Sequence, residues 1–342
     1  MSRRGILTAM TWFEHAANRP YIERIRALMA AREDSRVILF LGAGLSFGAS
    51  RRGRKGLAER DTWGHLNRSR SDDESSQNYA EVIINDDDEP FPTWSRLKSR
   101  MRVELLNLAN QDQSSLNRFF RTSDPLDCAQ LFRNVVGNAN YFEFLRRQFQ
   151  PSSPVDYWIT PSHDELVALE LPILFTTNYD DLVERAYAHH GQKLVVSSTV
   201  GEFIAHLQAK PERHLIKIHG SIDVPPTVVL TRDDYARARF ERKRIYEHLR
   251  FDMERTAYLF VGFSLSDPNI NMLLDDARLE TGGAIPPAYT VQGRYDRATD
   301  DYYRSMGINV VWIGTWDFLP SFLRAINPKH DLGTAKPGDF PI

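Results

Sequence analysis

The chain has almost no cysteine. Cys128 is the one cysteine among its 342 residues, which excludes a disulfide framework and any zinc site built from several cysteines. His and Cys residues also lack the paired spacing of a metal site. We therefore expect no structural metal, and a lone thiol is compatible with a reducing cytoplasm.

Long hydrophobic runs and a dominant charge are missing as well. No apolar stretch approaches the ~20 residues that a membrane span needs, and the segment from Gly5 to Phe13 is too short and mixed for a secretory signal. The formal net charge of −2 gives no overall field that attracts nucleic acid or a membrane surface. We expect a soluble cytoplasmic protein that does not contact membranes or bind nucleic acid directly.

One feature that the sequence does contain is a buried strand followed by a polar turn. Residues 37–41 are five consecutive apolar residues, rich in β-branched and aromatic types, which is typical of a strand buried on both faces of a parallel sheet. The turn Gly42, Ala43, Gly44 follows, and then Ser46. Such a turn lets backbone N–H groups approach a phosphate, and the Ser46 hydroxyl adds a donor. Alone the signal is weak, because ordinary strand–helix turns also use glycine.

Three later strands also end in small polar clusters. These are Thr177, Asn178 and Asp180 after 172–175, His219 after 214–218, and Gly262, Ser264 and Asp267 after 258–261. Because the carboxyl ends of the strands in an open α/β sheet lie on one edge, we expect these residues to converge there. Each also has a structural interpretation: Asn178 as a helix cap, His219 as a hydrogen-bonded histidine, and Ser264 and Asp267 as turn and cap residues.

The rest of the chain predicts an α/β fold with a Rossmann-like parallel sheet, helices on both faces, and an inserted small helical subdomain. We expect a helical extension at 1–36, the sheet domain at 37–330, the helical subdomain at 93–150 and a tail at 331–342. Further strands are predicted at 193–196, 228–230, 288–291 and 309–313. The charged segment 51–90 is predicted to be a mobile insertion. It would be a solvated loop, a lid over the ligand, or a patch that binds a partner or nucleic acid.

The four polar motifs resemble those of the sirtuin family. In order they read Gly-Ala-Gly-x-Ser, Thr-Thr-Asn-Tyr-Asp, Lys-Ile-His-Gly-Ser and Gly-Phe-Ser-Leu-Ser-Asp-Pro, and this wording is similar to the prokaryotic sirtuin-like branch found in antiphage defence systems. The match runs from about Val37 to Leu274. The resemblance implies a sheet that binds NAD and an activity that breaks its nicotinamide–ribose bond.

Carried over motif by motif, the resemblance assigns a role to each cluster. Gly42, Ala43, Gly44 and Ser46 would hold the pyrophosphate of NAD. Thr177, Asn178 and Asp180 would order the nicotinamide-side ribose and its water, and His219 would act as general base on a ribose hydroxyl. Gly262, Ser264 and Asp267 would line the second half of the dinucleotide.

Two departures from sirtuin deacylases decide which activity the resemblance favours. Those enzymes carry a four-cysteine zinc ribbon, which Cys128 alone cannot build. They also carry a Gly-Ile-Pro-x-Phe-Arg run where this chain has Ser50-Arg-Arg-Gly53. Hydrolysis of NAD needs less, because Asn178 and a neutral His219 suffice to orient water and accept a proton.

The leading hypothesis is therefore an NAD glycohydrolase that works without a metal and depletes NAD in antiphage defence. The alternatives are a sirtuin-type ADP-ribosyltransferase or protein deacylase, and a non-catalytic sensor of an NAD-derived nucleotide. An unrestrained NADase would empty its own host, so we expect control through a homo-oligomer, through a partner such as a HerA-type ATPase or an Argonaute-like protein, or through the 51–90 insertion.

Overall fold

The computed structural model describes residues 18–31, 37–46, 49, 92–108, 112–150 and 159–330. The predicted insertion at 51–90 and the predicted tail at 331–342 lie outside these residues. Within them, no helix combines the length and apolar composition that a membrane span requires.

The centre of the fold is a sheet of seven parallel strands in the order β3-β4-β2-β1-β5-β6-β7. Its strands are β1 (Val37–Leu41), β2 (Ile173–Thr176), β3 (Val195–Ser197), β4 (His214–Lys217), β5 (Ala257–Val261), β6 (Ala288–Gln292) and β7 (Ile308–Trp312). The predicted Rossmann-like α/β fold is confirmed. The chain adds β2, β4 and β3 on one side of β1 and β5, β6 and β7 on the other, so the strand order reverses beside β1. Open α/β sheets bind ligands at such a switch point.

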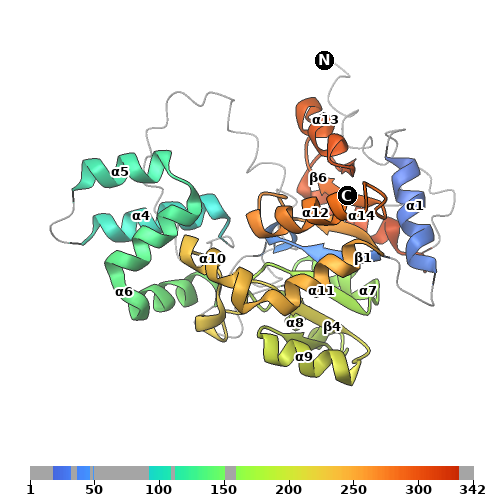
Figure 1. The fold of residues 1–342 in the computed structure, drawn as a ribbon, viewed down its shortest axis with the longest axis horizontal. Helices are drawn as coiled ribbons and strands as arrows, with labels where there is room; N and C mark the ends of the chain where they lie inside the picture. The colour runs from blue at the N-terminus through green and yellow to red at the C-terminus, as the bar shows by residue number, and fades with distance from the viewer. Residues whose placement is uncertain are drawn as a thin grey trace, which may run out of the picture.

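Helices cover both faces of the sheet (Figure 1). One face packs against α1 (Arg19–Ala30), α7 (Pro161–Ala168), α8 (Leu182–His189) and α14 (Leu319–Ile326), and the other against α9 (Val200–Ala209), α10 (Arg232–Glu241), α11 (Lys243–Met253), α12 (Pro268–Glu280) and α13 (Arg297–Ser305). Strand β1 shows why its sequence is apolar throughout. Leu39 and Leu41 enter the first core while Ile38 and Phe40 enter the second, because successive side chains point to opposite faces.

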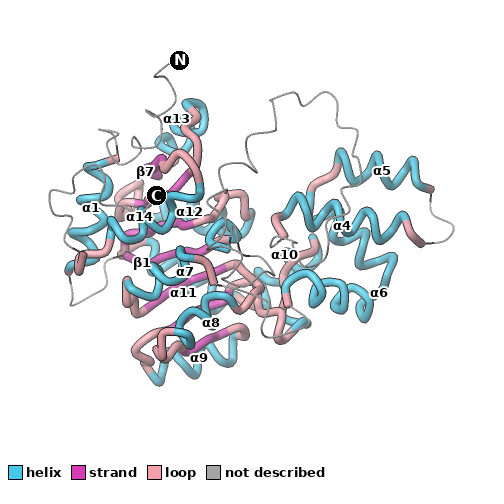
Figure 2. Tube along the Cα trace, turned by 180° about the vertical axis from the view of Figure 1, so that it is seen from behind, coloured by secondary structure: helices cyan, strands magenta, loops and turns pink. Residues whose placement is uncertain are grey.

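Three helices between β1 and β2 form a separate body beside the sheet (Figures 1 and 2). They are α4 (Trp94–Leu106), α5 (Gln113–Thr122) and α6 (Pro125–Phe149), and they enclose a third core that includes Phe132, Tyr141 and Phe144. Thr93 caps α4, and its side chain accepts the N–H of Arg96 at 3.4 Å. In both views α10 lies between this helical body and the sheet.

The strand predicted at 228–230 is wrong. These residues follow a short 3-10 helix, η3 (Pro225–Thr227), and have no strand pairing. Their side chains are apolar because the segment spans two cores: Val229 enters the core beneath α10, whereas Val228 and Leu230 enter the helical core. The Val229 N–H donates to the carbonyl of His219 at 3.0 Å, which fixes this segment beside the turn after β4.

Candidate active site at the carboxyl edge of the sheet

The strand register places the four polar motifs side by side. Across the central strands one row pairs Leu41 with Thr176 and Val261, and Thr176 with Lys217. The first candidate residue of each motif follows this row by one or two positions. Asn178 and His219 therefore stand at equivalent positions, each two residues beyond a paired residue of adjacent strands β2 and β4.

The glycines of the first and fourth motifs bring two turns into backbone contact. Gly42 and Gly44 donate their N–H groups to the carbonyls of Val261 (2.9 Å) and Gly262 (2.8 Å). A Cβ on Gly262 would lie 2.3 Å from the Leu45 nitrogen, and Gly262 has a φ of 64°. Only glycine fits such an approach without strain. These two amides, predicted to face a phosphate, are thus already bonded within the protein, and Ala43 is the exposed residue of the turn.

Asn178 is held by the ends of β1 and β2. Thr176 donates its hydroxyl to the Leu41 carbonyl (3.1 Å) and accepts the Asn178 N–H (3.0 Å). The Asn178 amide nitrogen then donates to the Gly42 carbonyl (3.2 Å) and lies 3.5 Å from the hydroxyl of Ser46. Both Asn178 and Ser46 are buried. The side chain of Asn178 is thus directed at the glycine turn rather than capping a helix, while Thr177 is half-buried beside it.

Asp180, and not Asn178, stabilises the start of the helix that follows β2. Its Oδ1 accepts the N–H of Leu182, the first residue of α8, at 3.1 Å. Burial raises the pKa of Asp180 to about 6, and the nearby Lys217 ammonium opposes this shift. These contacts make Asp180 a support of the turn that carries Asn178.

Lys217, the first residue of the Lys-Ile-His-Gly-Ser motif, belongs to this edge, although the resemblance assigns it no role. It is fully buried on β4, and its ammonium donates to the carbonyl of Asp180 (2.6 Å) and to Glu184 Oε1 (2.7 Å). A lysine inside an apolar strand is itself a signal, because a buried ammonium needs partners. Here it ties the end of β4 to the turn after β2.

His219 lies at the tight turn after β4, which Gly220 makes possible with a φ of 79°. The imidazole is 1% exposed and packs edge-on against the Tyr235 ring, with 5.0 Å between centroids. Burial lowers the pKa of His219, Asp267 raises it and Arg242 lowers it. The imidazole is therefore neutral at pH 7, which is the form that accepts a proton.

Asp267 combines a structural contact with a contact to His219. Its Oδ1 accepts the N–H groups of Asn269 and Ile270, both at 3.0 Å, and so caps α12. Its Oδ2 accepts the Tyr235 hydroxyl (2.9 Å) and lies 3.2 Å from His219 Nε2, which has no hydrogen-bond partner among the described residues. The Asp267 carboxylate thus faces the imidazole of His219, the residue predicted to act as general base.

Ser264 lies on the more exposed part of the same loop. Its hydroxyl is 2.5 Å from that of Ser266, and its carbonyl accepts the hydroxyl of Tyr303 at 3.0 Å. In the described conformation it therefore bonds within its own loop and to α13.

Tyr235 and Arg242 belong to this site but carry no sequence signal. Both lie at α10, a helix whose sequence is polar and follows no recognisable motif. The Arg242 guanidinium donates to the backbone carbonyls of Ser198 (3.1 Å) and Thr227 (2.6 Å), which fixes the end of the helix.

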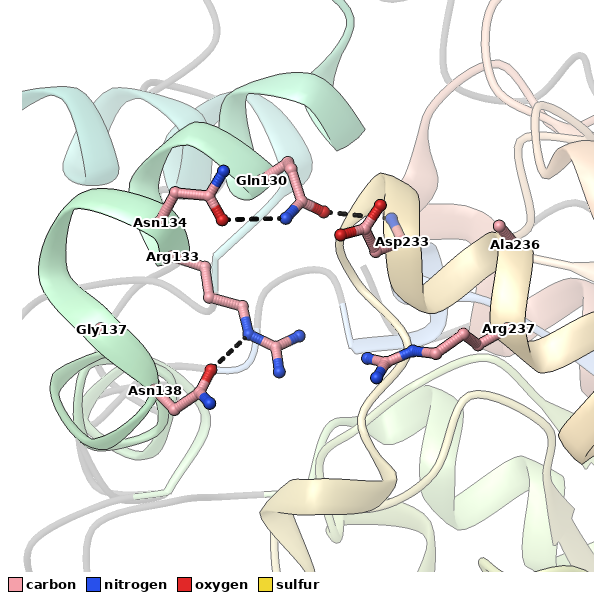
Figure 3. A pocket seen from close by; sticks show the side chains of 8 residues that line it. All are labelled: Gln130, Arg133, Asn134, Gly137, Asn138, Asp233, Ala236 and Arg237. Carbon is pink, nitrogen blue, oxygen red and sulfur yellow. Dashed lines mark hydrogen bonds between the residues drawn. The ribbon is translucent and has the colours of Figure 1, made fainter.

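A second set of contacts joins α10 to the helical body. Asp234, one residue before Tyr235, accepts Arg133 of α6 (2.8 Å) and Arg237 of α10 (2.7 Å) on the same oxygen. Figure 3 shows the two guanidinium groups directed toward each other across a pocket of about 490 Å³, at the point where α6 kinks at Gly137. Movements of the helical body can therefore reach the His219 group through α10.

Part of the chain matches a known family. The family model described as the SIR2-like domain matches residues 172–311, less than half of the chain, so this part is similar to that domain. The match includes Asn178, His219 and Asp267, whereas β1 and its glycine turn precede it.

Curated relatives are similar to this chain over parts of their length. "Defense-associated sirtuin 2" of Bacillus subtilis is 28% identical over 227 residues, which are 65% of this chain and 21% of that protein. "NAD(+) hydrolase ThsA" of Bacillus cereus (strain MSX-D12) is 32% identical over 120 residues, 35% of this chain and 25% of the relative. The ThsA of Enterococcus faecium is 28% identical over 234 residues, which are 61% of this chain and 48% of that relative. The chain thus spans between about a fifth and a half of these relatives.

Within the described residues, no group of three or more His, Cys, Asp or Glu side chains is arranged to hold a metal ion. Cys128 is buried in α6. The expected absence of a structural metal stays a prediction, which elemental analysis of the purified protein tests.

Proposed function

We propose that this protein is an NAD glycohydrolase, which cleaves NAD to nicotinamide and ADP-ribose. The observation that carries the proposal is the pair Asn178 and His219, at equivalent positions beyond β2 and β4, with the carboxylate of Asp267 behind the histidine. The printed names of the ThsA relatives, NAD(+) hydrolases, support the same reaction.

The chemistry requires few groups. Departure of nicotinamide leaves an oxocarbenium-like ribose, as in glycoside cleavage. Asn178 is oriented by the Gly42 carbonyl and would position the attacking water or a ribose hydroxyl with its amide. Neutral His219 would accept the proton, and Asp267 would stabilise the imidazolium that forms. General-base help of this kind contributes about 10²–10⁴-fold.

Access to the site requires movement. His219 is 1% exposed and Asn178 is 7% exposed, so a dinucleotide cannot reach them in the described conformation. Tyr235 of α10 packs over the imidazole. Displacement of α10 is the motion that would open the site, and such closures commonly gate turnover.

Incubation of the purified protein with NAD, followed by chromatography of the products, tests the activity. We expect equimolar nicotinamide and ADP-ribose from the wild type, and a loss of about 10²-fold or more in Asn178→Ala and in His219→Ala. Control variants are His189→Ala, an exposed histidine at the end of α8, and Asn140→Ala, an exposed asparagine of α6; both should keep full turnover.

The outcomes separate the competing functions. Nicotinamide without free ADP-ribose, together with an ADP-ribosyl mass on a protein, would replace hydrolysis by transfer. Loss of acyl groups from an acyl-lysine peptide would establish a deacylase. Tight NAD binding without any turnover in a folded protein would leave a sensor.

We also propose the setting in which this activity works. The protein would act in the bacterial cytoplasm as an NAD-depleting antiphage effector, as a homo-oligomer and with a separately encoded partner such as a HerA-type ATPase or an Argonaute-like protein. Support for the defence role comes from the printed name of the Bacillus subtilis relative. Expression with phage challenge, with cellular NAD measured in wild type and His219→Ala, tests it.

A further inference from the structure

A second polar hollow lies on the helical body, away from the strand ends. It is a groove of about 670 Å³ between α4 and α5. The two helices run antiparallel along it, since Arg102 of α4 donates to Asn117 of α5 (2.6 Å) and Lys98 donates to the Ser123 carbonyl beyond the end of α5 (2.8 Å). This volume lies in the range of ligand sites.

The charged side chains that line the groove are all positive. Its lining includes Lys98, Arg102, Arg118 and Arg121, with three serines and an asparagine, and no carboxylate among the described residues. Neither guanidinium of Arg118 and Arg121 has a hydrogen bond or ion pair within the described part of the chain, and both side chains are exposed. Two cations of α5 are therefore available to a ligand.

The charge of the helical body differs in sign from that of the whole chain. Residues 92–108 and 112–150 contain nine Lys or Arg and five Asp or Glu, whereas the full chain has a formal net charge of −2. The expectation that the protein does not bind nucleic acid rested on net charge, which does not describe this local field.

The dimensions and donors of the groove fit a chain of phosphates. Ser95 to Arg102 spans seven residues of helix, about 10 Å at about 1.5 Å per residue. A positively charged groove of this length can follow the backbone of a single strand. Serine hydroxyls, amides and basic side chains are the groups that contact phosphate oxygens in nucleic-acid complexes.

An aromatic side chain favours a single strand over a duplex. Trp94 is 36% exposed and stands four residues before Lys98 on α4, which puts the two on one helix face. Exposed aromatics beside a basic groove stack the unpaired bases of single strands.

We propose that the α4–α5 groove binds the phosphate backbone of single-stranded nucleic acid. This site is separate from the candidate active site, and its binding does not depend on NAD hydrolysis. It gives the helical body a ligand of its own, and the Arg133–Asp234 contact connects that body to α10.

Fluorescence anisotropy with a fluorescein-labelled 20-nucleotide oligothymidylate at several salt concentrations tests the proposal. We expect binding that weakens steeply with salt, a loss of about tenfold or more in Arg118→Gln/Arg121→Gln, and a salt slope reduced by about 1.4, since each contact contributes about 0.7 for a single strand. Trp94→Ala should weaken binding without changing the slope. The matched control is Arg244→Gln/Arg297→Gln, which removes two exposed arginines from α11 and α13 and should bind as the wild type does.

Circular dichroism and unchanged NAD turnover establish that the double variant is folded. No binding at 50 mM salt, or equal binding by wild type and double variant, would overturn the proposal. So would displacement of the oligonucleotide by equimolar ATP or tripolyphosphate, which would make the ligand a free phosphate compound, or preference for polyglutamate, which would make it an acidic protein.

Discussion

The two carboxylate oxygens of Asp267 have different roles, one in the structure of α12 and one beside His219. One oxygen caps α12, which any Asn could also do, whereas the other faces His219 with a charge that Asn lacks. A substitution by Asn therefore separates the two contributions, because Asn and Asp are equally good caps.

Asp267→Asn is predicted to lower kcat/KM for NAD by roughly 10- to 100-fold and to move the acid limb of its pH profile to lower pH. Asp267 raises the pKa of His219 against the lowering effect of burial, so removal of the carboxylate lets that pKa fall further below its ordinary value of about 6.5. Measurement of kcat/KM between pH 5 and 8 checks this. Asp296→Asn, the matched cap of α13, should leave both quantities unchanged, and an unmoved acid limb in Asp267→Asn would contradict the assignment.

Gly262 carries a prediction about stability. Gly262→Ala is expected to lower the free energy of unfolding by more than about 2 kcal/mol, because the new Cβ would lie 2.3 Å from the Leu45 nitrogen and φ is 64°. Urea unfolding followed by circular dichroism measures it. Gly201→Ala in α9, where nothing lies within 4 Å of the added carbon, should be neutral or stabilising by up to about 1 kcal/mol. Equal effects at both sites would show that the backbone contact is unimportant.

At the scale of an element, α7 depends on a histidine in an unusual position. His163 is buried at the third residue of the helix, and its Nδ1 accepts the N–H of Thr160 (3.1 Å) in a capping box. Burial lowers the pKa of His163 to about 4. Protonation therefore occurs more readily in the unfolded chain than in the folded one.

His163→Gln is predicted to reduce the loss of stability on acidification. A histidine with a pKa of about 4 when folded and about 6.5 when unfolded contributes stability above pH 6.5 that is lost as the pH falls, by about 2 kcal/mol at pH 5. Gln keeps an acceptor at the capping-box position and does not titrate. Thermal unfolding at pH 7 and pH 5 compares the two proteins. The raised pKa of Asp180 acts in the opposite direction but equally in both, so an identical pH dependence would contradict the role of His163.

The elements also show what a sequence can predict. Strands β1, β2 and β5 are recognisable because burial on both faces leaves nearly continuous apolar runs, and the edge where the strands end follows from parallel topology. The contribution of α10 was not predictable, since Arg133 and Asp234 meet across 101 positions and local patterns do not record such contacts. The same limit explains the error at 228–230, whose apolar residues serve two cores rather than a sheet.

At the scale of the whole molecule, α10 connects His219 to the helical body. Its Tyr235 packs on His219 and its Asp234 binds the helical body. Phe240 of the same helix is 82% exposed, the largest exposed fraction of any large apolar side chain in the described part of the chain. A single exposed apolar side chain does not by itself mark an interface, but a contact between copies at Phe240 would act on the helix that closes the site, so this position tests the proposed self-association.

The proposed self-association predicts that NAD turnover per chain rises with protein concentration. Phe240→Asp should shift the protein toward monomer and lower turnover at a given concentration, because the partner surface no longer bears on α10. Leu279→Asp on α12, where the wild-type side chain is 80% exposed, is the matched control and should do neither. Light scattering gives the mass and product chromatography gives the rate over the same concentration series. A monomer with full, concentration-independent turnover would contradict control by assembly, and loss of turnover in Phe240→Asp without a change in mass would place the effect within α10 itself.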